Sequence, residues 1–304
     1  TTEIYTLSLH DALPIWLWAM NRQVELDPES RSKCLIEYAD YLYSQFGVQT
    51  LHGTSLERGL GHGEHDASIL SLHTLAEDET IARLATGIKR FKLPPEFSYI
   101  RIYREVEAHE KLARIFEDRR QFSKAAEQWE LAGKKENADT IRGAWGRFEA
   151  APTQPTGDGG TIHFRFRNAR KVGLEARGIK IVDLLGDLKE FLKSRPREAG
   201  SLRIQADAVG PMIIAKDRER FIGERCAAWQ LDLDPPAGHF DRVIPIATPL
   251  QRPGAYLITA QIEGGNTSHV VLWIADTVIV KKPMAGHTDR KSTRLNSSHR
   301  IRYR

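Results

Sequence analysis

The hydrophobic residues of this chain change their spacing about halfway along it. Up to residue 150 they recur every three or four positions, as on one face of a helix, and after residue 160 they alternate, as along a strand. Between the two patterns, residues 151–160 are rich in Pro, Gly and Thr and follow neither spacing, which is typical of a linker. We therefore predict a multidomain chain, with an all-α, helical-repeat-like region at 16–150 and a mainly antiparallel β-sandwich at 161–282.

Two stretches in the first part of the α region have a helical pattern. Apolar residues at helix spacing predict a helix over residues 35–46, and Gly47 is placed to end it. A second helix is predicted over residues 77–92, because its acidic start and basic end complement the helix dipole and a Pro-Pro pair follows. Residues 51–73 are rich in Gly and His without a clear period, which favours a loop.

Residues 107–150 are predicted to form paired helices. Their small and large apolar residues resemble the tetratricopeptide pattern that lets two antiparallel helices nest, although His109, Ala113 and Asn137 depart from it. A third helix is predicted over residues 138–148. Since such repeats usually need neighbours, we expect more of them before Trp16 or in degenerate form within this region, and an irregular helical bundle is the alternative. The resemblance is carried by Leu112, Ala113, Phe116, Ala125, Trp129 and Ala132.

The second region is predicted to be built of strands with one short helical insertion at 182–193. Alternation of apolar and polar residues over 162–167 indicates a strand whose aromatic side chains face the core while its arginines face water. The clearest hairpin is residues 254–276, with a turn at Gly264-Gly265-Asn266. Short strands with turn signals favour an antiparallel sandwich. Further strands are predicted at 171–181, 202–209, 226–233 and 242–247.

The two ends of the chain resemble translations of sequencing adapters. The codons GAT CGG AAG AGC, for example, spell Asp289-Arg290-Lys291-Ser292. We therefore expect residues 1–15 and 289–304 not to be native. The chain carries a net charge of +4, but the first tail contributes −2 and the last +5, which leaves +1 for the interior. A nucleic-acid partner is therefore not predicted from charge.

Two further compositional features bound the chain. No apolar run approaches the roughly 20 residues of a membrane span, so we expect no membrane contact. Cys34 and Cys226 lie far apart, and two buried thiols are predicted, with a disulfide as the alternative.

The candidate chemical sites of the sequence all fall short of their motifs. His62-Gly63-Glu64-His65, near His52 and His73, could hold zinc, but its spacing is not H-E-x-x-H and its glycines disfavour a helix. The run Gly59-Leu60-Gly61-His62-Gly63 has no phosphate-loop lysine, and Gly53-Thr54-Ser55-Leu56-Glu57 has no second glycine of a nucleophile elbow. We predict a polar surface loop there, and no catalytic, cofactor-binding or metal-binding residue in the chain.

Other side chains are assigned structural roles. The strand Phe164-Arg165-Phe166-Arg167 could bind single-stranded nucleic acid, but strand alternation explains it more simply. Trp129, Trp145 and Trp273 lie on apolar stripes and are predicted to be core residues. The charge run Glu117-Asp118-Arg119-Arg120 is predicted to be a solvated turn between helices.

Two strand-rich strings resemble a macroglobulin domain of bacterial alpha-2-macroglobulins. Residues 253–283, PGAYLITAQIEGGNTSHVVLWIADTVIVKKP, are similar to its closing strands, and residues 166–194, FRNARKVGLEARGIKIVDLLGDLKEFLKS, to its opening strand and helical insertion. The resemblance extends over about 107–286. In it, residues 283–288 would begin the connection to a further macroglobulin domain.

The resemblance implies a scaffold without catalysis. Full-length members are similar to protease traps, in which a Cys-Gly-Glu-Gln thioester acylates the attacking protease. Cys34 is followed by Leu-Ile-Glu and Cys226 by Ala-Ala-Trp, so neither supplies that thioester, and no bait segment is identifiable. The implied partners are target proteases of the full-length parent and neighbouring macroglobulin domains. The implied location is the bacterial cell envelope or periplasm, or outside the cell.

Two other functions stay open at this point. A helical-repeat adaptor joined to a generic β-sandwich would bind a peptide on its concave helical face and would not be followed by a macroglobulin array. An enzyme using the histidine loop would bind a metal and show hydrolytic turnover by itself.

Overall fold

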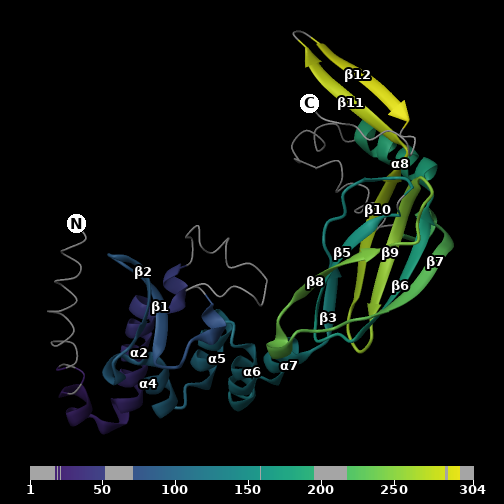
Figure 1. Ribbon diagram of the computed structural model, residues 1–304. Coiled ribbons are helices and arrows are strands. Elements are labelled where there is room, and N and C mark those ends of the chain that lie inside the picture. The colour runs from purple at the N-terminus through teal and green to yellow at the C-terminus, as the bar shows by residue number, and fades with distance from the viewer. Residues whose placement is uncertain are drawn as a thin grey trace. The chain divides into compact units, whose positions relative to one another are not determined.

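The computed structural model describes residues 18, 20, 22–51, 71–157, 159–194, 218–284 and 287–294. The chain divides into two compact units, which Figure 1 colours from purple to teal and from teal to yellow along the sequence. The first, here called the helical unit, ends at Arg142 and also includes Ala237–Phe240. The second, the sheet unit, comprises the remainder from Gly143 onward.

The helical unit contains a pair of strands among its helices. The α-helices are α2 (Arg31–Phe46), α4 (Tyr99–Glu105), α5 (His109–Asp118), α6 (Phe122–Leu131) and α7 (Lys135–Arg142). The strands are β1 (Glu79–Leu84) and β2 (Gly87–Lys92), and the 3-10 turns are η1 (Pro28–Ser30), η2 (Val48–Leu51), η3 (Leu72–Thr74) and η4 (Pro95–Phe97). The predicted helix over 35–46 is confirmed as part of α2.

The helix predicted over 77–92 is wrong, because these residues form the antiparallel hairpin β1–β2. Gly87 stands at the turn with a φ of 107°, a conformation that glycine adopts without strain. Glu79 and Arg90 pair across the strands at 2.7 Å, and Ile81 is fully buried. The acidic start and basic end of this segment therefore reflect cross-strand pairing of charges and not a helix dipole.

The helices α4 to α7 are joined by three turns that share the same backbone conformation and hydrogen bonds. Glu107, Arg120 and Gly133 each adopt a left-handed conformation, and each lies thirteen residues after the previous one. In every turn the next amide bonds back to an aromatic residue's carbonyl, from Ala108 to Tyr103, from Gln121 to Phe116 and from Lys134 to Trp129. Two such steps, which contain two helices, span 26 residues (2 × 13), fewer than the roughly 34 residues of a two-helix tetratricopeptide repeat.

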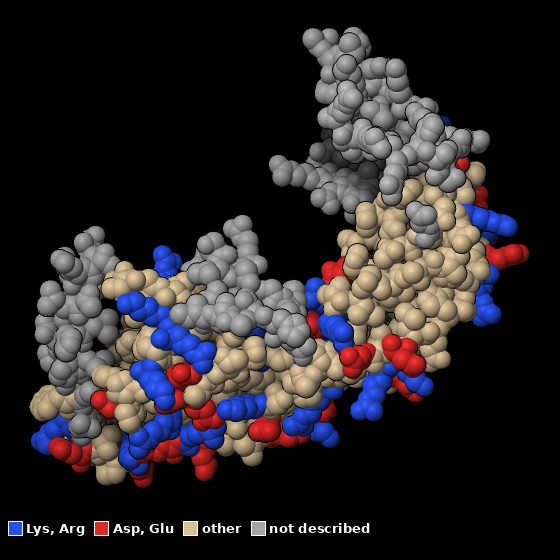
Figure 2. All heavy atoms as spheres, in the orientation of Figure 1, with Lys and Arg blue, Asp and Glu red and all other residues tan. Residues whose placement is uncertain are grey.

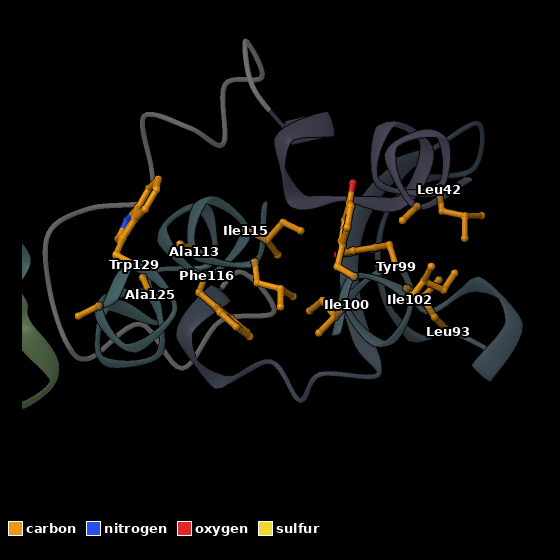
Figure 3. Packing of buried hydrophobic residues seen from close by; sticks show 14 of the residues in the cluster. Leu42, Leu93, Tyr99, Ile100, Ile102, Ala113, Ile115, Phe116, Ala125 and Trp129 are labelled. Atoms are coloured by element: carbon orange, nitrogen blue, oxygen red, sulfur yellow. The ribbon is translucent and has the colours of Figure 1, made fainter. Parts of the chain in front are cut away.

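The core of the helical unit lies where α2, α4, α5 and α6 meet. Tyr99, Phe116 and Leu42 are fully buried there, with Trp129 4% exposed. Figure 3 shows side chains of these helices converging in this cluster. Small residues such as Ala113 and Ala125 let α5 and α6 approach closely, so the pairing predicted from their sequence is confirmed.

The described residues of the sheet unit form two principal sheets and one helix of more than three turns. Its elements are β3 (Trp145–Phe148), β4 (Gln154–Pro155), β5 (Thr161–Arg167), β6 (Lys171–Ile179), α8 (Ile181–Ser194), α11 (Arg218–Phe221), β7 (Ile222–Asp232), β8 (Arg242–Ala247), β9 (Gly254–Ile262) and β10 (Thr267–Ala275). One sheet has the order β4-β10-β9-β6-β7 and the other β3-β5-β8. Neighbours are antiparallel except β4 and β10.

The start of the sheet unit differs from the predicted boundary. The predicted third helix over 138–148 ends at Arg142, and Trp145–Phe148 is a strand instead. The predicted linker 151–160 belongs to the sheet unit, where its strand β4 pairs with β10. Gly143 and Gly146 disfavour a continued helix, and the amide of Gln154 bonds the backbone of Thr161 in both directions.

One buried cluster receives side chains from both sheets. Phe164 and Phe166 enter it from one sheet, and Val172, Ile258 and Leu272 from the other, all of them fully buried. The strands predicted over 162–167, 171–181, 226–233 and 242–247 and the hairpin over 254–276 are confirmed, as is the helix over 182–193. The strand predicted over 202–209 lies outside the described residues.

The turn between β9 and β10 also fastens β3. Asn266 accepts a hydrogen bond from the Gly146 amide at 2.9 Å and donates one to the Gly146 carbonyl at 2.8 Å, and Ser268 Oγ accepts from Phe148 N–H. A Cβ on Gly265 would lie 2.5 Å from the carbonyl oxygen of Ala144, so only glycine permits this close approach. The side chain of Asn266 therefore replaces a neighbouring strand at this edge of β3.

The last described residues form the hairpin of β11 (Thr277–Met284) and β12 (His287–Arg294). Its strands contain residues 283, 284, 287 and 288 of the stretch predicted to begin a connection, and residues 289–294 of the predicted adapter-derived tail. The other such tail, residues 1–15, lies outside the described residues.

Candidate functional site

The histidine-rich loop lies largely outside the described part of the chain. His52, His62 and His65 belong to residues 52–70, as do the two glycine-containing motifs. His73 is described and packs edge-on against Phe240, with ring centres 5.4 Å apart. Within the described residues, no group of three or more His, Cys, Asp or Glu side chains is placed to hold a metal ion.

The outer face of the three-stranded sheet differs in part from its prediction. Phe164 and Phe166 are in the core, as predicted, but the side chains of Arg165 and Arg167 are only 11% and 20% exposed. Arg165 pairs with Glu149 at 2.6 Å, and Arg167 covers the ring of Trp145 at 5.9 Å. The expectation that these arginines face water is therefore wrong, because acidic and aromatic neighbours cover them.

The charge run at the end of α5 is not a solvated turn. Arg119 is fully buried, and its guanidinium donates to the carbonyls of Ala76 and Glu79 and to the hydroxyl of Tyr99. Glu117 accepts a hydrogen bond from the indole of Trp129 at 2.8 Å. Arg119 therefore holds the segment before β1 against the helical core, a role its sequence context hides.

Of the remaining predictions for single residues, some are confirmed and others are wrong. Trp129 is buried as predicted, whereas Trp145 and Trp273 are half-buried. Cys34 is buried but Cys226 is exposed, because it lies on the edge strand β7; both are free thiols.

A groove on the helical unit is a candidate binding site. It has a volume of about 770 Å³ and lies between α2, α4, α5 and the end of α6. Its lining combines two tyrosines, charged groups of both signs and the exposed Leu131. Figure 2 shows that charges of both signs are mixed over the visible surface of this unit. We call this feature the α2–α5 groove.

Two tyrosine–aspartate hydrogen bonds connect the walls of the α2–α5 groove. Tyr103 on α4 donates to Asp40 on α2 at 2.5 Å, and Tyr43 on α2 donates to Asp118 on α5 at 2.5 Å. Burial, and then the hydrogen bond and charge of the aspartate partner, raise the pKa of both tyrosines far above 10. The phenols therefore stay neutral donors and fix the orientation of both carboxylates.

The cations of the groove are already paired with carboxylates. Lys111 lies 2.8 Å from Asp40, and Arg114 lies 2.7 Å from Glu110. Lys134 also reaches Glu110 at 2.8 Å, and these two cations lower the pKa of that carboxyl. Among the described residues, no lysine or arginine forms an ion pair with Asp118 or Glu107. The groove therefore has a surplus of negative charge.

Sequence reasoning did not find this groove. Its wall residues are 75 positions apart in the case of Tyr43 and Asp118. The only signal in the sequence was Asp118, an acidic residue of the charge run that we predicted to be a solvated turn.

Comparison with known proteins gives weak matches only. No protein-family model matches the chain, and neither does any curated protein. Solved structures of native alpha-2-macroglobulin from Escherichia coli are found at low similarity. The structure spanning domains NIE-MG1 shares 14% identity over 51% of this chain and 71% of its own, with a TM-score of 0.34. The structure spanning MG0-NIE-MG1 shares 14% identity over 50% of this chain and 46% of its own, at 0.33.

The cryo-EM structure of the native conformation of the same E. coli protein shares 15% identity over 50% of this chain and 9% of its own, with a TM-score of 0.31. All these TM-scores are too low to establish a common fold or function. None of the helices in the described part of the chain combines the length and apolar character that a membrane crossing requires.

Proposed function

We propose that this chain is a non-catalytic scaffold segment of a bacterial protein similar to the alpha-2-macroglobulin endopeptidase inhibitors. In this proposal the sheet unit is a macroglobulin-like β-sandwich with α8 as its helical insertion, and the helical unit precedes it. The thioester and the bait segment would lie elsewhere in the full-length parent, whose place is the cell envelope, the periplasm or the cell exterior. The partners are a target protease of that parent and neighbouring macroglobulin domains.

The observation that carries this proposal is the pairing of the two strings on which the resemblance rests. One string supplies β6 and the other β9 and β10, which are more than 70 residues apart in sequence. They are adjacent in one sheet, in register from Val172 opposite Ile262 to Gly178 opposite Tyr256. The inner side chains of both strings enter the cluster that they share with the three-stranded sheet. This arrangement supports the assignment of the two strings to the opening and closing strands of one sandwich domain.

The experiment begins with the DNA from which the chain was read. Sequencing across both ends should reveal a longer reading frame with further sandwich-patterned domains, and it should replace the two predicted adapter tails by native sequence. The full-length protein, incubated with trypsin, should then retain the protease in a complex by size-exclusion chromatography and reduce its cleavage of a protein substrate. A frame that ends directly after the sheet unit, or a protein that leaves trypsin free and active, contradicts the proposal.

A protein-interaction adaptor is the second candidate, and the α2–α5 groove favours it. A groove of this volume, lined by fixed carboxylates and an exposed leucine, suits a side chain of a partner. The same DNA sequence separates the two candidates, because the adaptor requires no array of sandwich domains.

A further inference from the structure

The α2–α5 groove has a negative charge that its own cations leave uncompensated. Asp40 and Glu110 are each paired with a cation, but Asp118 accepts a hydrogen bond only from the neutral Tyr43 among the described residues. Glu107 stands at the rim in the turn before α5, exposed and without an ion pair among these residues. A ligand with a positive group would compensate this charge, whereas an anion would be repelled by it.

The groove also has an apolar contact surface at the end of α6. Leu131 is 62% exposed although it is large and hydrophobic, and Ala132 and Ala108 continue the lining beside it. Such a surface suits the alkyl stem of a long side chain, whose charged end then reaches further. A small inorganic cation would leave this apolar surface in contact with water.

We propose that the α2–α5 groove binds an arginine or lysine side chain presented by an extended segment of a partner protein. The cationic group pairs with Asp118, and the alkyl stem and the preceding residue of the partner lie against Leu131. Tyr43 keeps the Asp118 carboxylate in place in the free protein, so less ordering is needed when the cation arrives. The inference rests on the groove alone and is independent of the scaffold proposal.

The net charge of the chain makes the inference specific to this site. The sequence carries +4 overall, and +1 without the two predicted adapter-derived tails, so no net negative charge attracts a basic peptide to the molecule as a whole. Attraction of such a peptide must therefore come from a local arrangement of carboxylates. This separates the proposed binding from general charge attraction.

The test is calorimetric titration of the full chain with the hexapeptide Ala-Ala-Leu-Arg-Ala-Ala. We expect a Kd of roughly 100 µM or tighter at low salt, weakening as salt rises. The matched peptide with citrulline in place of arginine has the same shape without the charge, and it should bind at least about tenfold more weakly. Absence of binding, or equal binding of the two peptides, overturns the inference.

Substitutions then locate the peptide on the protein. Asp118→Asn removes the charge but keeps an acceptor for Tyr43, and it should weaken binding about five- to tenfold. Glu127→Gln removes an equally negative, exposed charge on α6 outside the groove, so it serves as the control and should change nothing. Equal weakening by both variants contradicts the assigned site.

A second variant guards against loss of folding in the first. Leu131→Ala changes a side chain that is mostly exposed, so the helical unit should keep its circular dichroism and thermal unfolding. It should weaken the peptide about threefold by removing the apolar contact. Unchanged affinity in a folded Leu131→Ala protein shows that the alkyl stem does not lie where we place it, and so contradicts the proposed binding mode.

Discussion

The helical unit and the sheet unit bury different kinds of group. Among the described residues, the buried polar or charged ones in the helical unit are Ser71, Thr80, Ser98, Arg119 and Gln128, against Thr248 in the sheet unit. The core of the sheet unit is apolar, and its backbone groups bond mostly along the strand ladders. Figure 2 shows a similar contrast outside, since the visible face of the sheet unit carries few charges compared with the helical unit.

The difference follows from how each unit meets its backbone hydrogen bonds. Strands in a sheet satisfy one another, so side chains are left to fill the core. In the helical unit, short helices and a hairpin are joined by connecting segments whose carbonyls need other donors. Arg119 and Gln121 supply them, since Gln121 donates to the carbonyls of His73 and Leu75. Irregular connections in a compact unit therefore place polar side chains inside it.

The largest expected effect tests the apolar core of the sheet unit. Phe164→Ala removes a fully buried ring that contacts Phe148 and Phe166, and it should lower the free energy of unfolding of this unit by about 3–5 kcal/mol. Chemical denaturation followed by tryptophan fluorescence measures the loss. As a control, Val243→Ala on the outer face of the same sheet should cost under about 1 kcal/mol.

The buried guanidinium of the helical unit should be nearly as important. Arg119→Leu leaves the carbonyls of Ala76 and Glu79 without these donors, and a loss of about 2–4 kcal/mol is expected. Arg119→Lys keeps the charge but not the fork of donors and should fall in between. Urea unfolding monitored by circular dichroism at 222 nm gives the values. If Arg119→Leu is as stable as the unmodified protein, the buried polar groups of the helical unit do not contribute to its free energy of unfolding as we expect.

The clamp on β3 is expected to contribute less. Asn266→Ala removes the two hydrogen bonds to Gly146, which should destabilise the sheet unit by about 1–2 kcal/mol. Asn266→Asp keeps the acceptor for the amide but loses the donor, so it should be intermediate. Amide hydrogen exchange provides a local measure, because exchange at Gly146 should accelerate in Asn266→Ala more than exchange at Phe166. If exchange at Gly146 is no faster in Asn266→Ala and Asn266→Asp than in the unmodified protein, the side chain of Asn266 does not hold β3 in place.

The smallest expected effect is a dependence on alkaline pH that falls on the helical unit. Burial and the neighbouring aspartates raise the pKa of Tyr43 and Tyr103 above the ordinary value of 10.0. A group with a raised pKa stabilises the fold below its unfolded pKa, and this contribution is lost as pH rises above it. The Tm of the helical unit should therefore fall above about pH 10, and less so in a Tyr43→Phe, Tyr103→Phe protein, relative to each protein at about pH 8.

This pH test has an internal comparison in the sheet unit. The pKa of Tyr256 is raised chiefly by burial, and no aspartate contributes to this shift. Its hydroxyl donates a hydrogen bond to the Arg252 carbonyl. Replacing it by Phe should leave the alkaline loss of helical signal unchanged. If Tyr256→Phe protects the 222 nm signal as well as the double substitution does, the assignment to the helical unit is wrong.

The sequence predicted the sheet unit better than the helical unit for a physical reason. Strands with one buried face show strict alternation, so β5 and the β9–β10 hairpin could be placed from Phe164, Phe166 and the Gly-Gly-Asn turn. In residues 77–92 the apolar positions fit both periods, and the hairpin is defined by the backbone pairing of β1 with β2 across the turn at Gly87. The short polar stretch 151–160 was predicted as a linker because the partner strand of β4 lies far along the chain.

The candidate site was less predictable than the fold. A buried arginine and an exposed one look alike in a charge run, and Arg119 is buried because of backbone carbonyls that no pattern reveals. The α2–α5 groove depends on side chains such as Tyr43 and Asp118 that meet only after the helices pack. The spacing of apolar residues along one helix carries no information about contacts between residues this far apart in sequence.

The identical turns at Glu107, Arg120 and Gly133 have a consequence for how this protein can evolve. Each turn is closed by the same backbone bonds and places an aromatic residue at the same point of the preceding helix. Duplication or deletion of one such thirteen-residue segment would keep every remaining helix in phase with its neighbours. Such a change would alter the row by one whole step, while contacts such as Tyr103 to Asp40 and Tyr43 to Asp118 tie particular helices to α2.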